Sequence, residues 1–224
     1  ACAHRTSRYA TLLFGWVTLG FFKMADAMRQ TIVEMLKGIE RYNPDNLATL
    51  EKYVEIQSRE NAYDLEANLA VLKLYQLDPQ RFNQDVTCQI LLKALTNFPH
   101  TDFVLCKCLL TEKIMQEEPI NQIMYLGDIL EQCDFQHFWD RVLSMPELCN
   151  RIVGFQDSIR KFVCHVVGIT FQTIDKALLA QLLGGVDVCL SGHSYLSLYS
   201  YCYRDNKKIY IVTKLIKSSS SCKK

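Results

Sequence analysis

Five prolines punctuate the middle of this 224-residue chain, at positions 44, 79, 99, 119 and 146. Between them the apolar residues recur at intervals of three and four rather than two, which is the period of an amphipathic helix. Because proline ends a helix or occupies its first turn, the pattern predicts a string of helices joined by short turns. Three of the prolines lie 20 residues apart, a cadence typical of stacked helical pairs.

The clearest predicted helix begins at Asn43-Pro44, where Asn43 can cap the helix and Pro44 suits its first position. Its apolar face consists of Leu47, Leu50, Tyr53 and Val54. Further helices are predicted over residues 63–76, 82–96, 101–116, 119–132 and 135–143. Within the stack over residues 44–144 we expect these leucines to be buried: Leu50, Leu65, Leu69, Leu72, Leu91, Leu95, Leu109, Leu126 and Leu130.

The pattern changes after Met145-Pro146, which is the best candidate for a domain boundary. Helices are predicted over residues 155–167 and 173–183, with a short strand at residues 169–171 between them. Alternating tyrosines and aliphatic residues over 186–217, with a turn at Asp205-Asn206, predict a β-hairpin. A two-stranded hairpin alone is barely stable in water. We therefore expect it either to pair with the strand at residues 169–171 or to cover apolar surface left by the absent third helix of the second domain.

Composition and charge exclude several classes of protein. The chain is 49% apolar and 22% charged, which is typical of a folded protein rather than a disordered one. Residues 24–184 carry a net charge of −7, whereas the two ends are basic, so the bulk of the chain is a poor match for a phosphate backbone. No run of about 18 apolar residues occurs, and we expect no membrane span.

Two observations bear on the cellular compartment. Arg5 and Arg8 precede an apolar run over residues 10–22, and Ala25-Asp26-Ala27 has the form of a cleavage site, as in a signal peptide. Against this, five of the ten cysteines lie in apolar periodic stretches, at Cys88, Cys106, Cys133, Cys149 and Cys164, and none of the nine asparagines lies in a glycosylation sequon. We favour reduced thiols and an intracellular protein.

The sequence offers little catalytic chemistry. It contains no phosphate-binding loop, dinucleotide-binding fingerprint, zinc-protease motif or nucleophile elbow. Cys106 and Cys108 would point apart on a helix and cannot grip one metal ion. Cys164 beside His165 leaves a thiol hydrolase as a remote alternative, although adjacent helical residues diverge. No cofactor or metal is expected.

Four blocks of sequence carry a resemblance to a known family. They are NPDNLATLE from Asn43, NAYDLEANLA from Asn61, ILLKALTNFPHTDFVLCKCL from Ile90, and GFQDSIRKFVCHVVGITFQTID from Gly154. Over about residues 24–184 they closely resemble the subunit K family of eukaryotic translation initiation factor 3, in the PCI superfamily. The resemblance implies a mainly α fold of PCI type, in which a HEAT-like helical stack precedes a winged-helix domain.

The resemblance also implies a domain organisation and shows where the chain departs from it. Residues 24–148 would form the HEAT-like domain and residues 149–184 the start of the winged helix. Met24 is expected to be the initiator, which makes residues 1–23 an extension outside the family pattern. Residues 185–224 are a divergent, tyrosine-rich and basic tail, so the third helix of the winged fold is missing or replaced and the winged helix is incomplete.

The function implied is that of a non-enzymatic scaffold or adaptor subunit of the initiation factor, supporting pre-initiation complex assembly on the small ribosomal subunit. The implied partners are subunits L and E of the factor, of which E is only nearby, and, through the complex, the small ribosomal subunit, with weak direct RNA contact and no membrane. The implied location is the cytoplasm, with the nucleus as a second location. A winged-helix RNA-binding module and a thiol hydrolase are the alternatives. We expect the partner surface to include Phe155, Arg160, Phe171, Ile174, Lys176 and Leu179.

Overall fold

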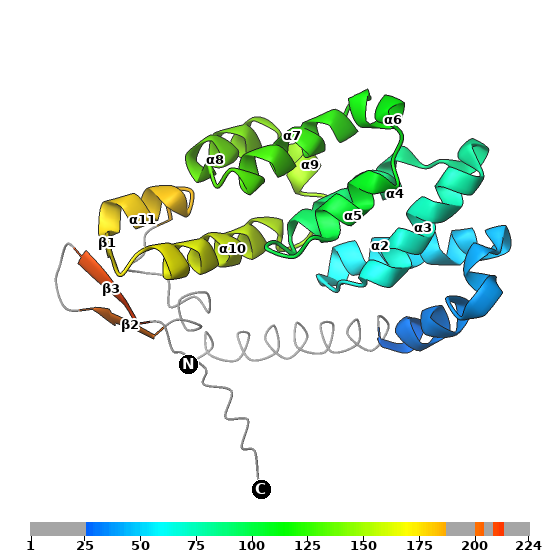
Figure 1. The fold of residues 1–224 in the computed structure, drawn as a ribbon, viewed down its shortest axis with the longest axis horizontal. Coiled ribbons are helices and arrows are strands. Elements are labelled where there is room, and N and C mark those ends of the chain that lie inside the picture. The colour runs from blue at the N-terminus through cyan, green and yellow to red at the C-terminus, as the bar shows by residue number, and fades with distance from the viewer. Residues whose placement is uncertain (1–25, 187–199, 204–207, 213–224) are drawn as a thin grey trace, which may run out of the picture. The chain divides into compact units, whose positions relative to one another are not determined.

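The computed structural model describes residues 26–186 and the backbone of two strands, at residues 200–203 and 208–212. These residues are mainly α-helical, as predicted (Figure 1). The extension at residues 1–23, the turn at Asp205-Asn206 and the third helix of the winged fold fall outside the described residues. After helical residues 26–35 come the 3-10 helices η1 (Gly38–Tyr42), η2 (Pro44–Asn46) and η3 (Pro79–Arg81) and the α-helices α2 (Leu47–Glu60), α3 (Leu65–Leu77), α4 (Gln84–Leu95), α5 (Asp102–Cys108), α6 (Glu112–Gln116), α7 (Ile120–Glu131), α8 (Phe135–Ser144), α9 (Pro146–Cys149), α10 (Phe155–Thr170) and α11 (Lys176–Leu182).

The chain divides into two compact units. The described part of unit 1 consists of residues 26–127 and 145–155. Unit 2 consists of residues 128–144 and 156–186 together with the two strands near the C-terminus. The chain therefore leaves unit 1 within α7 and returns to it through α9 before α10 begins. Within the described residues, none of the helices has the length and apolarity that crossing a membrane requires.

The start of α2 follows the sequence prediction. The side chain of Asn43 accepts a hydrogen bond from the backbone N–H of Asp45 at 3.0 Å, and Pro44 opens η2, which runs directly into α2. Capping by Asn and an initial Pro satisfy or remove N–H groups that a helix start leaves without partners. The predicted apolar face of α2 is buried, at Leu47, Leu50, Tyr53 and Val54.

Helices α2, α3, α4 and α5 pack against one another and form the core of unit 1. Asp64 caps α3 by accepting a hydrogen bond from the backbone N–H of Ala67 at 3.2 Å. Burial is confirmed for six of the nine predicted leucines, whereas Leu65, Leu69 and Leu109 are half-buried. Residues 44–144, all of which are described, contain no strand.

The helix predicted over residues 101–116 is wrong, because the structure divides it into α5 and α6. Thr111 begins the second helix, since its hydroxyl accepts a hydrogen bond from the backbone N–H of Ile114 at 3.5 Å. Threonine is a preferred capping residue and competes with continuation of the preceding helix. The exposed fractions of Val104 and Leu105, 47% and 44%, show that α5 buries a narrower stripe than the predicted helix would.

The strand predicted at residues 169–171 is also wrong. Helix α10 continues through Ile169 to Thr170, whose hydroxyl donates a hydrogen bond to the carbonyl of Val166 at 2.7 Å. The strand is β1 (Thr173–Asp175), and α11 begins only at Lys176. Asp175 caps α11 by accepting a hydrogen bond from the N–H of Ala177 at 2.8 Å. The observed helix therefore begins three residues later than the helix predicted over residues 173–183. The reason is that Asp175, which lies inside the predicted range, is the capping residue and not part of the helix.

The predicted hairpin strands are confirmed at the backbone level. Strands β2 (Ser200–Tyr203) and β3 (Lys208–Val212) are antiparallel, and β3 also pairs antiparallel with β1 in a three-stranded sheet of order β1-β3-β2. Ile174 lies opposite Ile209 in this register. The hairpin therefore pairs with an earlier strand, which is one of the two expected alternatives, but with residues 173–175 instead of 169–171.

Candidate partner interface

The end of α11 is held against α8 by Trp139. Its indole N–H donates a hydrogen bond to the backbone carbonyl of Leu182 at 2.8 Å. Gly184 follows with a φ of +81°, and a Cβ atom built there would lie 2.8 Å from Cδ2 of the Trp139 ring. Glycine is therefore required twice at this position, for the left-handed backbone and for the close approach of the indole.

The two glycines after α11 complete a Schellman motif. The N–H of Gly184 donates to the carbonyl of Gln181 at 3.0 Å, and the N–H of Gly185 donates to that of Ala180 at 2.8 Å. This pattern satisfies carbonyl groups that a helix end leaves without partners. The last turn of α11 is thus closed by its own backbone as well as by Trp139.

Arg160, one of the predicted partner residues, is committed within unit 2. Its Nε donates to the carbonyl of Leu183 at 3.1 Å, its Nη1 to Asp157 at 3.0 Å and its Nη2 to Gln156 at 3.3 Å. The guanidinium also lies over the Trp139 ring, with 5.1 Å between Cζ and the ring centroid. The side chain is only 16% exposed. Arg160 therefore holds the turn after α11 and has few donors left for a partner.

The other predicted partner residues divide by burial. Phe155, Ile174 and Leu179 are buried, so they shape the surface without forming it. Lys176 is half-buried, and Phe171 is 37% exposed. Phe155 belongs to unit 1, whereas the other five belong to unit 2, so the structure does not place the six in one compact unit.

Two exposed apolar residues were absent from the sequence prediction. Ile169, in the last turn of α10, is 68% exposed, and Leu178, in α11, is 37% exposed. With Phe171, which follows α10, they are the exposed large apolar side chains of the stretch from the end of α10 to α11. We call Ile169, Phe171 and Leu178 together the α10–α11 apolar surface. Leu178 adjoins the buried Leu179, and adjacent helical positions point about 100° apart. This divergence is the sequence signal that one of the two leucines faces outward.

Four of the described thiols, those of Cys88, Cys106, Cys149 and Cys164, are buried and poorly suited to nucleophilic chemistry. Burial raises the pKa of Cys106 to about 12 and those of Cys88 and Cys149 to about 11, so these thiols remain protonated at neutral pH. Cys164 is 1% exposed, which denies a substrate access to its sulfur. Among the described residues, no three His, Cys, Asp or Glu side chains are grouped so that they could hold a metal ion.

Comparison with known proteins identifies the family. The family model described as CSN8/PSMD8/EIF3K matches residues 81–189. Proteins named eukaryotic translation initiation factor 3 subunit K are similar over most of the chain. The one from Bombyx mori is 72% identical over 164 residues, which is 73% of this chain and 75% of the relative. Identity to the human protein is 62% over 161 residues, covering 72% of this chain and 74% of the relative.

A third relative extends the similarity. The protein from Xenopus tropicalis is 56% identical over 186 residues, covering 83% of this chain and 85% of its own length. The chain belongs to the eukaryotic translation initiation factor 3 subunit K family.

Proposed function

We propose that the chain is a non-catalytic scaffold subunit of eukaryotic translation initiation factor 3 and supports assembly of the pre-initiation complex on the small ribosomal subunit. The observation that carries this proposal is the 72% and 62% identity to relatives named as subunit K of that factor. Such a subunit works in the cytoplasm. Its task is to hold neighbours together, which requires surfaces rather than a catalytic pocket.

The finer architecture that we propose is a HEAT-like helical stack followed by an incomplete winged-helix domain of PCI type. Mutually packed helices α2 to α5 support the first part. For the second part, the order α10, β1, α11 and then an antiparallel hairpin supports a winged helix, in which the hairpin serves as the wing. We place the domain boundary near residue 148, as the sequence pattern indicates.

We propose that the partner surface of unit 2 is the α10–α11 apolar surface with the neighbouring Lys176. Of subunits L and E, we propose that L binds this surface and that E lies nearby. The exposure of Ile169, Phe171 and Leu178 within ten residues of one another in the chain supports this, because large apolar side chains left in water can mark interaction sites. The buried Ile174 and Leu179 would support this surface from below. Arg160 would act by holding the turn after α11 in place.

The test is assembly of purified full-length chain with a factor 3 complex that lacks this subunit. Wild-type chain should join the complex, and the double variant Ile169→Asp/Leu178→Asp should bind at least about 10-fold more weakly, because charges would enter an apolar contact. The matched control is Ile39→Asp, at a residue of η1 that is 83% exposed. Wild-type chain that fails to join the complex would contradict the proposed function. Equal binding by the double variant would contradict the proposed surface alone.

A further inference from the structure

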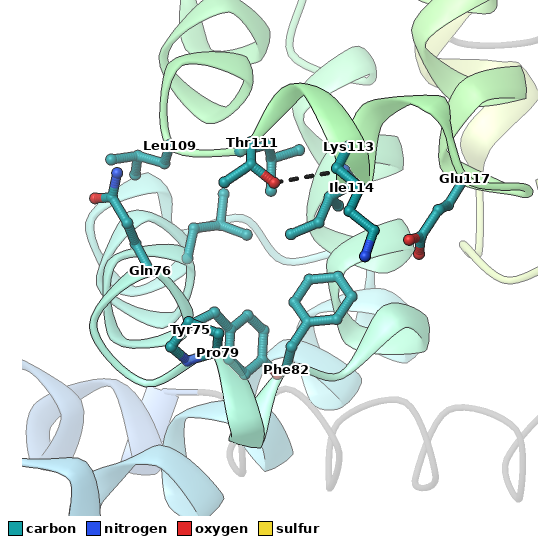
Figure 2. A pocket seen from close by; sticks show the side chains of 11 residues that line it. Tyr75, Gln76, Pro79, Phe82, Leu109, Thr111, Lys113, Ile114 and Glu117 are labelled. Carbon is teal, nitrogen blue, oxygen red and sulfur yellow. Dashed lines mark hydrogen bonds between the residues drawn. The ribbon is translucent and has the colours of Figure 1, made fainter.

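Unit 1 contains an apolar groove that the proposed function leaves unused. It has a volume of about 290 Å³ and lies between the end of α3 with η3 and the segment from α5 to α6. Figure 2 shows Tyr75, Pro79 and Phe82 along one side and Leu109 and Ile114 along the other. The volume lies at the low end of the range for small-molecule pockets, so it suits a few apolar side chains better than a cofactor.

The walls of the groove are held in place by contacts among the lining residues and by one hydrogen bond to α2. The rings of Tyr75 and Phe82 meet edge to face, with 5.5 Å between their centroids. The hydroxyl of Tyr75 donates a hydrogen bond to Glu51 of α2, and the hydroxyl of Thr111 accepts one from the N–H of Ile114. Both sides are therefore preorganised, which lowers the entropic cost of binding.

Two opposite charges stand at one end of the groove. Figure 2 shows the ammonium group of Lys113 and the carboxylate of Glu117 on the same side, on and just after α6. Both residues are exposed, and neither has an ion-pair partner among the described residues. They are four residues apart, which is about one helical turn.

This combination favours a polypeptide over other occupants. A lipid tail or a neutral small molecule would form no ion pair with Lys113 or Glu117. A nucleic acid would be repelled by the Glu117 carboxylate, and its phosphates would make no favourable contact with the apolar walls. A helix carries apolar anchors at intervals of three and four and can present an acidic and a basic side chain one turn apart. Its charges would then complement Lys113 and Glu117 while its apolar face fills the groove.

We propose that this groove binds an amphipathic helix of a neighbouring subunit of the initiation factor, with an acidic side chain of that helix at Lys113 and a basic one at Glu117. The inference rests on the proposed function, because it takes the partner from within the same complex. It adds a second contact, on unit 1, that is independent of the α10–α11 apolar surface. The chain would thus bind its neighbours through both units.

The test measures binding of the full-length chain to a factor 3 complex that lacks this subunit. Gln76→Trp, at an exposed rim position, should obstruct the groove and weaken binding about 10-fold. The matched control is Gln80→Trp, at an exposed position of η3 that does not line the groove. The double variant Lys113→Glu/Glu117→Lys should weaken binding to a similar degree, because like charges would face each other. Its control is Lys52→Glu, on the exposed face of α2.

The outcomes separate the two proposals. If wild-type chain binds and the Gln76 and rim-charge variants bind equally well, the groove inference is wrong and the proposed function stands. If Gln80→Trp weakens binding to the complex as much as Gln76→Trp does, the groove is not the contact. If wild-type chain does not join the complex, both proposals fail. A benzophenone side chain introduced at Gln76 in the assembled complex should crosslink to a segment with helical apolar periodicity, and a crosslink to RNA would overturn the proposal.

Discussion

The two units offer different examples of how buried polar side chains connect parts of the fold. In unit 1, side chains hydrogen-bond to one another between elements, such as Gln57 of α2 to Asn68 of α3 at 2.9 Å, and Tyr63 in the turn before α3 to Asp102 of α5 at 2.8 Å. Gln57 and Asn68 are 0% and 1% exposed. In unit 2, Trp139 and Arg160 instead bind backbone carbonyls in the turn after α11.

This difference indicates how each unit specifies its structure. A buried amide pair between two helices is satisfied in only one register, so it selects that register against slipped alternatives. A side chain bound to a backbone carbonyl instead selects the path of a turn. The Gln57–Asn68 pair of unit 1 therefore fixes how two helices align. In unit 2, the bonds from Trp139 and Arg160 to backbone carbonyls fix the path of the chain after α11. Four sets of substitutions test this comparison.

The largest effect is expected from truncation in the unit 1 core. Leu91 is 0% exposed in α4, so Leu91→Ala should lower the free energy of unfolding by about 2 to 5 kcal/mol through lost burial and a cavity. Leu69→Ala should cost less, about 1 to 2 kcal/mol, because Leu69 is only half-buried. Chemical denaturation of both variants measures the difference, and equal losses would contradict this description of the core.

The sequence predicts unit 1 well because its signals are local. The cap at Asn43, the proline after it and the spacing of Leu47 and Leu50 lie within a few residues of one another, and each has a direct physical reading. Residue Thr111 shows the limit of such signals. A threonine can cap a new helix or continue an old one, and the surrounding packing decides between them.

The candidate site in unit 2 was harder to predict because its bonds join residues far apart in the chain. Trp139 and Gly184 are 45 positions apart, and no periodic pattern connects them. Arg160 was predicted to contact a partner, yet its donors are used inside unit 2. The sequence does not indicate which residues a charged side chain on an amphipathic helix will contact. The contacts of Arg160 follow from the tertiary path of the chain, which brings the turn after α11 next to it.

A buried lysine in unit 1 makes its stability depend on pH. Lys93 is 1% exposed, its Nζ donates to Oδ1 of Asn61 at 3.2 Å, and burial lowers its pKa from 10.5 to about 8. Between those pH values the unfolded chain binds the proton and the folded chain does not, so this group makes the fold more stable as pH rises. Its burial cost, about 3 kcal/mol, is fully present below pH 8.

Lys93→Met isolates this effect. At pH 7 the variant should gain stability relative to wild type, and that advantage should fall by about 3 kcal/mol between pH 7.5 and pH 10.5. The pH dependence of wild-type stability alone would not isolate the contribution of Lys93. The raised pKa values of Cys106 and Tyr53, both about 12, make stability fall above about pH 9 and oppose it. Both chains share those groups, so the difference cancels them. A difference that does not change with pH would contradict the prediction.

The two glycines after α11 provide a matched pair in unit 2. Both have positive φ, +81° at Gly184 and +77° at Gly185, so alanine at either position costs about 1 kcal/mol in backbone strain. Only at Gly184 would the new Cβ also meet the Trp139 ring, raising the total to about 2 kcal/mol. Thermal unfolding of both variants measures the increment. Equal losses would show that the indole does not approach this turn as described.

The smallest effect is expected at Arg160, and it distinguishes a structural residue from a partner contact. Arg160→Lys keeps the positive charge but loses the planar fork that reaches Leu183, Asp157 and Gln156 together. The isolated chain should therefore lose about 1 kcal/mol of unfolding free energy. The matched control is the adjacent, exposed Lys161, where Lys161→Arg should leave stability unchanged because no comparable contacts are altered. If Arg160→Lys leaves the isolated chain as stable as wild type but weakens binding to the initiation factor complex, Arg160 contacts a partner directly, and the turn after α11 depends on Trp139 and its glycines alone.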